Sequence, residues 1–286
     1  MNLSEIFKIS FKELHSAGLE SPHLEASWII EKFTQLNAVQ RIQFPELPIS
    51  EAALEQIVCA VNRRKTGEPL AYILEEKQFY GLNFYVDKNV LIPRPETELL
   101  VDWALECVAK LQLKKAQVSI LDLGCGSGCI GLALLSRTSN TRLTGIDISE
   151  NTLQVARKNA LAHNFQSRSL FINMDASDIH NLSEKFDLIV ANPPYIDESD
   201  NEIEENVKRF EPHIALFSEQ GLAHTRSWLG STQQILADDC AIGFEVGHGL
   251  SDKVLDLFKN LDVLSKIYTI RDYANINRVV CGERIG

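Results

Sequence analysis

From about residue 117 onwards, short apolar strands alternate with helices, and this alternation restricts the fold more than any other feature of the chain. Runs rich in β-branched residues occur at VSILDL, RLTGIDI, SLFINM, FDLIVAN and AIGFEVG, with helical stretches between them. A helix after each strand carries the chain back across the sheet, so that the next strand can pair in parallel. We therefore expect an α/β fold, a mostly parallel sheet with helices on both faces. Two final strands, at about 263–269 and 278–282, would add an antiparallel edge strand.

The first part of the chain follows a helical period instead. Apolar side chains recur every three or four positions between Leu3 and Leu14, and similar stretches begin after Ser21 and Ser50. This spacing places the apolar side chains on one face of each helix. We predict a small all-helical domain over residues 1–76.

Two short β-rich runs, FYGLNFYV and KNVLIP, separate this helical part from the rest. We interpret residues 77–94 as a β-hairpin linker that turns at residues 87–89. The α/β domain would then extend over residues 95–286.

Composition and charge narrow the class of protein. Apolar residues make up 45% of the 286, enough to bury a core, and the formal net charge is −11. A protein that follows phosphate backbones needs a basic face, so this charge argues against direct contact with nucleic acid. The six cysteines include no C-x-x-C pair, and no apolar run is long enough to span a bilayer. We expect reduced thiols, no metal site, no membrane segment and a cytoplasmic location.

A glycine-rich turn follows the first strand of the α/β domain. Glycines let a chain turn tightly at the carboxyl edge of a parallel sheet and bring backbone close to a ligand. The dinucleotide pattern G-x-G-x-x-G is present but begins too late, after the strand has ended. The pattern directly after the strand is D-L-G-x-G-x-G, whose carboxylate suits a cationic or amino-bearing ligand. The candidate ligand-binding residues of this turn are Asp122, Gly124, Cys125, Gly126, Ser127 and Gly128.

Asp147 ends the second strand of the α/β domain. A carboxylate at this place suits a bidentate grip on ribose hydroxyls. S-adenosylmethionine carries a sulfonium, an α-amino group and a ribose, so the two features together predict it as the cofactor. A plain tight turn without a ligand is the alternative at this point.

The segment Asn192-Pro193-Pro194-Tyr195 directly follows the strand FDLIVA. Two prolines remove two amide donors and fix φ at both positions, so backbone carbonyls there stay available to a ligand. The Asn192 side-chain carbonyl adds a second acceptor, and two acceptors suit a planar NH₂ group, which has two donors. Tyr195 offers a ring face to a flat group. We predict that these four residues bind an amide or exocyclic amine; a proline-stiffened loop without a ligand is the alternative.

The two motifs together resemble those of class I methyltransferases that use S-adenosylmethionine and act on a planar nitrogen, including adenine-N6 and glutamine-N5 enzymes. Further segments make the chain similar to the peptide chain release factor glutamine methyltransferases. They are EPLAYIL, FYGLNFYV and VLIPRPETELLV in residues 68–101, FEPHIAL and GL in residues 210–222, GFEVGHG in residues 243–249 and RDYANINRVVCG in residues 271–282. The resemblance covers most of the chain, including the helical N-terminal part.

The resemblance implies a Rossmann-like class I methyltransferase fold and a reaction in translation termination. In that reaction the methyl group of S-adenosylmethionine passes to the side-chain amide nitrogen of the glutamine in the Gly-Gly-Gln loop of bacterial class 1 release factors. Residues 192–195 would hold the glutamine amide and carry catalysis, and the helical domain would recognise the substrate. We expect a monomer. Besides the glycine turn, the residues implied to contact the cofactor are Arg94, Glu96, Thr97, Asp147, Asp175, Ala176 and Asn192.

Three positions depart from the pattern of that family. Glu75 stands where glycine is common, at the junction of the two domains. Ala176 stands where a bulky, often aromatic residue is common, which would weaken stacking on adenine. Asn275 replaces the glycine of a turn, and because asparagine tolerates positive φ we expect the turn to survive.

Two other functions share some of these features. An adenine-N6 methyltransferase acting on nucleic acid would use the same Asn-Pro-Pro-Tyr motif, but it needs a phosphate-tracking surface and a target-reading domain. A module that binds S-adenosylmethionine without catalysis is less compatible with the intact motif. The acidic run after Tyr195 is either a solvated loop or a docking edge for a basic partner. It consists of Asp197, Glu198, Asp200, Glu202, Glu204 and Glu205.

Overall fold

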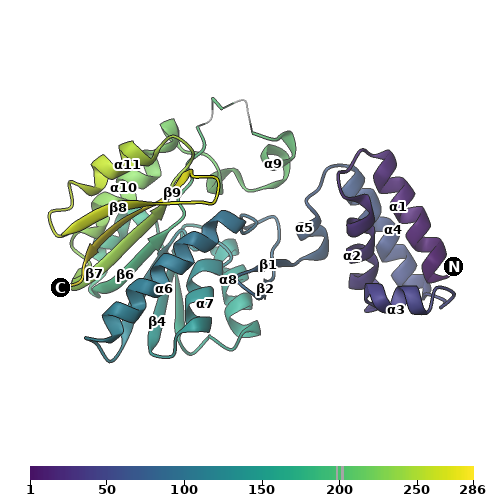
Figure 1. Cartoon of the computed structure of the whole chain (residues 1–286), viewed down its shortest axis with the longest axis horizontal. Coiled ribbons are helices and arrows are strands. Elements are labelled where there is room, and N and C mark those ends of the chain that lie inside the picture. The colour runs from purple at the N-terminus through teal and green to yellow at the C-terminus, as the bar shows by residue number, and fades with distance from the viewer. Residues whose placement is uncertain (198, 201–202) are drawn as a thin grey trace. The chain divides into compact units, whose positions relative to one another are not determined.

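The computed structural model describes residues 1–197, 199–200 and 203–286, so Glu198 and Glu202 of the acidic run lie outside the described residues. The chain forms two compact units, Met1–Glu76 and Lys77–Gly286. Figure 1 shows helices in the first unit and a sheet between helices in the second.

The first unit consists of helices and has a core of its own. Three longer helices, α1 (Leu3–Ser16), α2 (Pro22–Thr34) and α4 (Glu51–Lys65), pack against one another, and α3 (Ala38–Gln43) and α5 (Leu70–Leu74) are short. The predicted helical N-terminal part is therefore confirmed. The buried side chains of its core are Leu3, Ile6, Leu14, Ala26, Ile29, Ile30, Ile57, Ala60, Val61 and Ile73.

Side-chain contacts fix the ends and the packing of these helices. α1 begins with a capping box, in which Asn2 Oδ1 accepts from Glu5 N at 2.9 Å and Glu5 Oε2 accepts from Asn2 N at 3.0 Å. The Arg64 guanidinium of α4 donates twice to the Glu25 carboxylate of α2, at 2.7 and 3.1 Å. Such bidentate pairs are strong and directional, so this one sets the register of α2 against α4.

The second unit begins with a hairpin of β1 (Lys77–Phe79) and β2 (Leu82–Phe84). Tyr80 and Gly81 form its turn, with φ of 51° and 77°. Two successive residues with positive φ make a tight turn that matches the twist of the strands. The predicted turn at residues 87–89 is therefore wrong. Val90 and Ile92 of KNVLIP are buried by packing in an irregular segment rather than by pairing in a strand, and Leu91 is half-buried.

A seven-stranded sheet forms the centre of the second unit, in the order β5-β4-β3-β6-β7-β9-β8 (Figure 1). The strands from β3 to β7 pair in parallel, while β9 lies between β7 and β8 and is antiparallel to both. This confirms the mostly parallel sheet. The strands are β3 (Val118–Leu123), β4 (Thr141–Asp147), β5 (Ser169–Asn173), β6 (Phe186–Ala191), β7 (Leu236–Glu245), β8 (Lys266–Arg271) and β9 (Asn277–Arg284).

Helices cover both faces of this sheet. The first three, α6 (Glu98–Gln112), α7 (Cys129–Arg137) and α8 (Glu150–Ala162), lie on one face, and α10 (Ala223–Thr232) and α11 (Ser251–Phe258) lie on the other (Figure 1). The helix expected over about 220–237 ends at Thr232, because β7 already begins at Leu236. Within the described residues, no helix is both long and apolar enough to cross a bilayer. Shorter elements are α9 (Glu205–Phe210) and the 3₁₀ helices η1 (Pro95–Thr97), η2 (Ala176–Asn181), η3 (His213–Ala215) and η4 (Glu219–Gly221).

The strand order reverses between β3 and β6, because the connections after β3 and β6 run to opposite sides of the sheet. A crevice at the carboxyl edge of the sheet accompanies such a reversal, and α/β folds bind ligands there.

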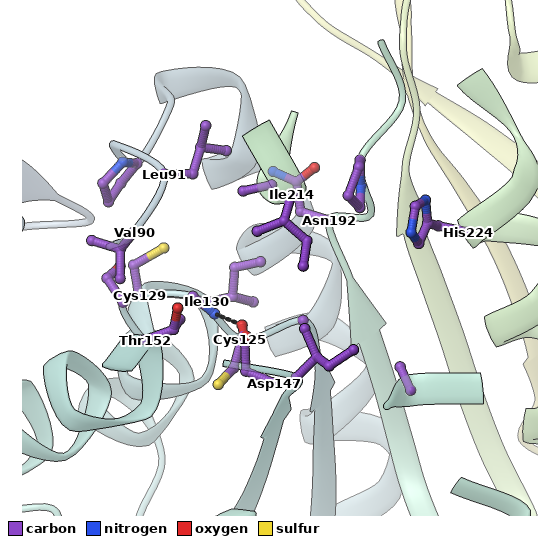
Figure 2. A pocket seen from close by; sticks show the side chains of 18 of the residues that line it. Val90, Leu91, Cys125, Cys129, Ile130, Asp147, Thr152, Asn192, Ile214 and His224 are labelled. Carbon is purple, nitrogen blue, oxygen red and sulfur yellow. Dashed lines mark hydrogen bonds between the residues drawn. The ribbon is translucent and has the colours of Figure 1, made fainter. Parts of the chain in front are cut away.

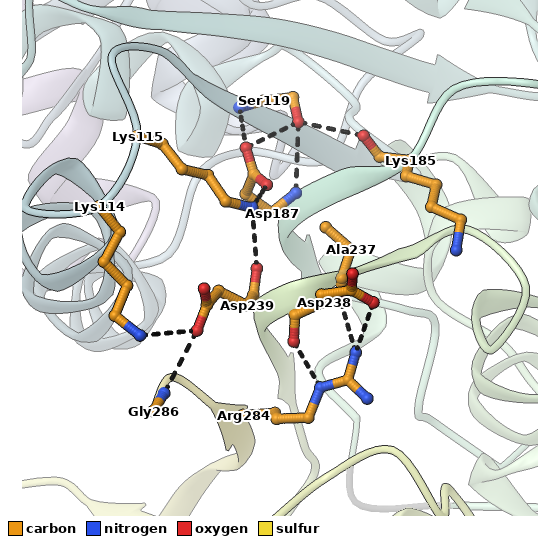
Figure 3. Close-up of polar contacts among 10 residues, drawn as sticks. All are labelled: Lys114, Lys115, Ser119, Lys185, Asp187, Ala237, Asp238, Asp239, Arg284 and Gly286. Atoms are coloured by element: carbon orange, nitrogen blue, oxygen red, sulfur yellow. Dashed lines mark hydrogen bonds and ion pairs between the residues drawn. The ribbon is translucent and has the colours of Figure 1, made fainter.

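Charged side chains close the opposite edge of the sheet (Figure 3). Asp187 of β6 accepts from Ser119 N of β3 at 2.8 Å and also from Lys115 Nζ. Lys114 Nζ donates to Asp239 Oδ1 of β7 at 2.9 Å. These contacts join three central strands away from the carboxyl edge.

Candidate functional site

Two adjoining pockets lie at the carboxyl edge of the sheet. The first is lined by the glycine turn after β3, by Asp147 at the end of β4 and by Asn192 after β6. The second is lined by the segment after Asn192 and by α9. Leu91, Arg94, Asn192 and Ala215 line both pockets, so Asn192 stands at their boundary. Figure 2 shows Asn192 and Asp147 on opposite sides of the first pocket.

The glycine turn has the backbone conformation that its sequence requires. Gly124, Gly126 and Gly128 have φ of 63°, 56° and 79°, a region that residues with a side chain rarely adopt. Asn159 of α8 holds the turn by donating from Nδ2 to the carbonyl oxygen of Ser127 at 2.9 Å. The members of the turn that line the first pocket are Gly124, Cys125, Gly126 and Ser127.

Asp147 lines the same pocket from the end of β4. Its Oδ2 accepts from Gly126 N at 3.1 Å, and its Oδ1 accepts from Ser149 N at 3.0 Å. Burial raises the pKa of this carboxyl, although the backbone N–H groups favour its charged form. Each oxygen keeps a free lone pair, so the carboxylate can accept from two neighbouring hydroxyls.

Asp122 does not line either pocket in the described structure. It is completely buried beneath the glycine turn, where its Oδ2 accepts from Gly131 N of α7 at 3.0 Å. Among the described residues its Oδ1 has no hydrogen-bond partner. Burial raises the pKa of Asp122 to about 7. This carboxyl group thus anchors the first turn of α7. Gly128, at the N-terminus of α7, likewise lies outside the pocket lining.

The first pocket has an aromatic wall that the sequence did not reveal. Asp175 and Ala176 line it after β5, beside His224 and Trp228 of α10. A Cβ atom on Gly124 would lie 2.6 Å from Trp228 Cη2, so the indole packs directly on the glycine turn. The small side chain of Ala176 is thus accompanied by a large aromatic side chain from another element.

Residues 94–97 form the corner before α6, and some of them line the pockets while others lie at the surface. Thr97 is buried and lines the first pocket, Arg94 lines both, and the described side chain of Glu96 is exposed and lines neither. Arg94 Nη2 donates to Glu211 Oε1 at 2.6 Å. The same carboxylate accepts from Ile92 N at 3.2 Å, so Glu211 holds the corner from the segment FEPHIAL.

Residues 192–195 are shared between the two pockets. Asn192 and Pro194 line the first, while Asn192, Pro193 and Tyr195 line the second. Asn192 Nδ2 donates to Thr97 Oγ1 at 3.3 Å, which leaves Asn192 Oδ1 available to a ligand. The prolines and the amide of the motif therefore stand where the two pockets meet.

The tyrosine of the motif is fixed by β7 and the turn after it. Tyr195 Oη donates to Glu245 Oε1 at 3.4 Å. A Cβ atom on Gly247 would lie 2.9 Å from Tyr195 Cδ2, so this glycine makes room for the tyrosine ring. The segment GFEVGHG thus supports the Asn-Pro-Pro-Tyr loop from behind.

The cysteines of the glycine turn are not poised for chemistry. Burial raises the pKa of Cys125 and raises the pKa of Cys129 to about 12, so both thiols are neutral near pH 7. In residues 1–197, 199–200 and 203–286 no group of three or more His, Cys, Asp or Glu side chains is arranged to hold a metal ion.

The described part of the acidic run has two different surroundings. Asp197 Oδ1 accepts from Ser199 N at 2.9 Å, which turns the chain directly after the motif. Glu204 lines the second pocket together with Val207 of α9.

Several side chains that build the site were not predicted. Asn159 and Trp228 lie in amphipathic helices, where their positions indicate packing rather than ligand contact. Glu211 and Glu245 lie in segments that the resemblance singled out, but a sequence does not show what a carboxylate will touch across the fold.

Comparisons with known proteins show the family of the chain. Two family models match, the Methyltransferase small domain over residues 100–211 and the PrmC N-terminal domain over residues 5–74. The release factor glutamine methyltransferase of Chlorobaculum tepidum is 34% identical over 279 residues, covering 96% of this chain and 94% of the relative. That of Buchnera aphidicola is 34% identical over 286 residues, covering 99% of each. The chain belongs to the release factor glutamine methyltransferase family.

Solved structures show the same fold. The hMettl16 catalytic domain in complex with the MAT2A 3′UTR hairpin 6 has a TM-score of 0.55 and 12% identity, covering 83% of each chain. A SAM-dependent methyltransferase from Agrobacterium tumefaciens has a TM-score of 0.50 and 13% identity, covering 73% of this chain and 69% of that chain. These likenesses concern the fold, that of class I methyltransferases.

The three departures of this chain from its family pattern have different surroundings. Asn275 has φ of 63°, and its N–H donates to Asp272 O at 2.9 Å, so the turn forms as expected of asparagine. Glu75 has φ of 52° and ends α5 in the left-handed region that favours glycine. Ala176 lies in the pocket that Trp228 also lines.

Proposed function

We propose that this protein transfers the methyl group of S-adenosylmethionine to the side-chain amide nitrogen (N5) of the glutamine in the Gly-Gly-Gln loop of bacterial class 1 peptide chain release factors. The observation that carries this proposal is the position of Asn192 at the boundary between two pockets. One pocket can hold the methyl donor and the other can admit the glutamine side chain. Membership of the family supports the choice of substrate.

The residues of the first pocket fit S-adenosylmethionine. Asp147 presents two acceptor oxygens, and Asp175 adds a second carboxylate to the lining. The buried hydroxyl of Ser127 has no hydrogen-bond partner of ordinary geometry among the described residues, so it can bond to a ligand. These groups suit hydroxyls and amino groups, and Trp228 suits a flat ring. When bound, the cofactor supplies a methyl group on a positively charged sulfur.

The Asn-Pro-Pro-Tyr loop supplies the orientation that the acceptor nitrogen needs. An amide nitrogen is a weak nucleophile because its lone pair is delocalised into the carbonyl group. Asn192 Oδ1 and the Pro193 carbonyl oxygen accept hydrogen bonds from the two N–H groups of the substrate amide. These bonds fix the plane of the amide and increase electron density on its nitrogen. Alignment of this kind lowers the activation free energy by about 7–11 kcal/mol in favourable cases. After transfer the cationic amide loses its proton to water.

The two units would have different functions. In this proposal residues 1–76 recognise the release factor, residues 77–94, which begin with the hairpin of β1 and β2, act as a linker, and residues 95–286 carry the chemistry. The protein acts in the cytoplasm as a monomer and makes no direct contact with nucleic acid. The net charge of −11 supports the last point, because a phosphate backbone would be repelled.

Transfer of label decides between substrates. The protein is incubated with methyl-labelled S-adenosylmethionine and with release factor, DNA or RNA in separate reactions. We expect label in the release factor and its loss when the glutamine of the Gly-Gly-Gln loop is replaced by alanine. Label in adenine of DNA or RNA, with none in the release factor, would replace this proposal with an adenine-N6 methyltransferase.

A further inference from the structure

A histidine at the wall of the first pocket is held through only one of its two ring nitrogens. His224 lies in the first turn of α10 and lines this pocket (Figure 2). Its Nδ1 lies 3.0 Å from Ser218 Oγ, and its backbone N donates to the same oxygen at 3.3 Å. In the described part of the chain, its Nε2 has no hydrogen-bond partner. This nitrogen is therefore the polar atom of the ring that remains for a ligand.

The Ser218 hydroxyl decides which ring nitrogen carries the hydrogen. Ser218 is 2% exposed, and among the described residues its hydroxyl bonds only to His224. A hydroxyl group has one hydrogen and two lone pairs, and here one lone pair accepts from the His224 backbone N–H. A hydrogen on Nδ1 would leave the buried hydroxyl hydrogen without an acceptor, which is costly. The hydroxyl therefore donates to Nδ1, and the neutral imidazole carries its hydrogen on Nε2.

The face of α10 that carries His224 packs on the segment after β5. Ser227 Oγ donates to Ser177 Oγ at 2.7 Å, and Ser231 Oγ donates to the Ser177 carbonyl oxygen at 2.6 Å. Because His224, Ser227 and Ser231 are spaced three and four residues apart, they share one face of the helix. Asp175 Oδ1 accepts from Ser177 N at 2.8 Å. His224 and Asp175 thus line one pocket from two elements that Ser177 joins.

These two side chains offer complementary groups to a flat ligand. Asp175 Oδ2 has no hydrogen-bond partner among the described residues and can only accept when ionised, whereas His224 Nε2 donates. Ala176 and Trp228 line the same pocket and leave space for a ring. Adenine presents an exocyclic NH₂ donor beside ring nitrogens that accept. One free acceptor and one free donor at an aromatic wall therefore match the edge of adenine.

We propose that His224 is a further cofactor-binding residue, which donates from Nε2 to a ring nitrogen of the adenine of S-adenosylmethionine. Ser218 is then a positioning residue, because its hydroxyl keeps the hydrogen of the imidazole on Nε2. The inference rests on the proposed function, since it requires S-adenosylmethionine in the first pocket.

Binding of the product S-adenosylhomocysteine, measured by calorimetric titration, tests this role without turnover. His224→Phe keeps a ring against Trp228, which the imidazole meets edge-on at 5.9 Å between ring centroids, but removes both nitrogens. The matched control is His180→Phe. His180 is an exposed histidine of η2 whose Nδ1 lies 3.2 Å from Ser177 O, and it lines neither pocket. We expect the Kd to rise about tenfold in His224→Phe and to stay within about twofold in His180→Phe.

Changes of single atoms in the ligand identify the acceptor. The 1-deaza, 3-deaza and 7-deaza analogues of S-adenosylhomocysteine each replace one ring nitrogen of adenine with C–H. In the wild type, one analogue should bind about tenfold more weakly than the parent compound. In His224→Phe, the same analogue and the parent should bind within about twofold of each other, because the donor is already absent. If the effect of every analogue is the same in both proteins, the inference is overturned.

The tautomer provides a readout that a merely structural role would not change. In full-length protein with ¹⁵N-histidine at about pH 8, where an ordinary imidazole is neutral, the ring signals of His224 are assigned by their loss in His224→Phe. His224→Leu replaces that variant if it does not fold. We expect the Nε2–H tautomer, with an Nε2 signal that shifts when S-adenosylhomocysteine binds. Ser218→Ala should give a mixture of tautomers and raise the Kd about threefold.

The outcomes separate this inference from the proposed function. The Nδ1–H tautomer in the wild type, or an Nε2 signal that the ligand leaves unchanged, would overturn the role of His224 alone. A wild-type protein that does not bind S-adenosylhomocysteine would refute the placement of the cofactor, and the role of His224 with it.

Discussion

Arg94 and Glu211 lie 117 positions apart in the sequence and form an ion pair, with 2.6 Å between Arg94 Nη2 and Glu211 Oε1. The Glu211 side chain is almost completely buried, whereas Arg94 is about one-third exposed and lines both pockets. The pair therefore fixes the wall that the two pockets share. Because Glu211 also accepts from Ile92 N, the loop before Arg94 depends on the same carboxylate.

Replacing Glu211 with glutamine should weaken this wall. Glu211→Gln keeps the volume but removes the charge that holds Arg94, and we expect a loss of about 1–3 kcal/mol in the free energy of unfolding. The KM for both S-adenosylmethionine and release factor should rise, since Arg94 borders both sites. Denaturant unfolding and initial rates measure the two effects.

The control for this variant is an exposed pair of the same type. Glu150 and Arg157 of α8 form an ion pair in which both side chains are about half exposed. Glu150→Gln should change the free energy of unfolding by less than about 1 kcal/mol, because exposed pairs contribute little. Equal losses in the two variants would contradict a special role for Glu211.

Trp228 should take over the stacking role that Ala176 is too small to perform. We expect Trp228→Ala to weaken S-adenosylmethionine binding about tenfold, since a stacked ring contributes roughly 1–2 kcal/mol. Ala176→Trp alone should also weaken binding, because the new ring would compete for the space beside Trp228. The double variant should bind more tightly than the Trp228→Ala single variant. Calorimetric titration of the four proteins measures this coupling, and strictly additive effects would show that the two positions do not share a site.

Because of Asp122, we expect the free energy of unfolding to fall as pH rises. Burial raises its pKa to about 7, so the folded state holds this proton more tightly than the unfolded chain does. A proton held in excess by the folded state means that stability falls as pH rises from about 4 through 7. Asp122→Asn removes this dependence while its oxygen can still accept from Gly131. Burial likewise raises the pKa of Glu245 to about 7, but Glu245 is present in both proteins, so the difference between them isolates Asp122.

Denaturant unfolding at pH 5 and pH 8 tests that expectation. Between the two pH values the wild type should lose up to about 3 kcal/mol more of its unfolding free energy than Asp122→Asn. Parallel pH dependences in the two proteins would refute the assignment of a raised pKa to this residue.

Much of the fold was predictable because its signals are local. The strand VSILDL and the glycines after it form as expected, since positive φ at Gly124, Gly126 and Gly128 requires residues without a side chain. The position of β9 between β7 and β8 depends on pairing between distant segments, which no local pattern encodes. The hairpin turn was misplaced because Tyr80 is an unusual residue for positive φ and KNVLIP has the composition of a strand.

The site was predictable only where the backbone itself makes it. Three parts of the site can be recognised from the sequence because each lies at or directly after the end of a strand. They are the turn after β3, Asp147 and the Asn-Pro-Pro-Tyr segment. Trp228, Glu211 and Glu245 reach the site through tertiary packing, and each resembles an ordinary core or surface residue in the sequence. The carboxylate of Asp122 was expected to face a ligand, whereas the structure places it beneath the turn. The sequence thus does not specify in which direction a side chain points.

The most direct test of the central claim is the single-turnover rate of methyl transfer from S-adenosylmethionine to release factor by Asn192→Ala. Asn192 is claimed to orient the substrate amide, so its side-chain carbonyl contributes to the rate rather than to cofactor binding. We predict a fall of at least about 100-fold in that rate, with the Kd for S-adenosylmethionine changed less than about threefold. A rate close to that of the wild type would contradict the account.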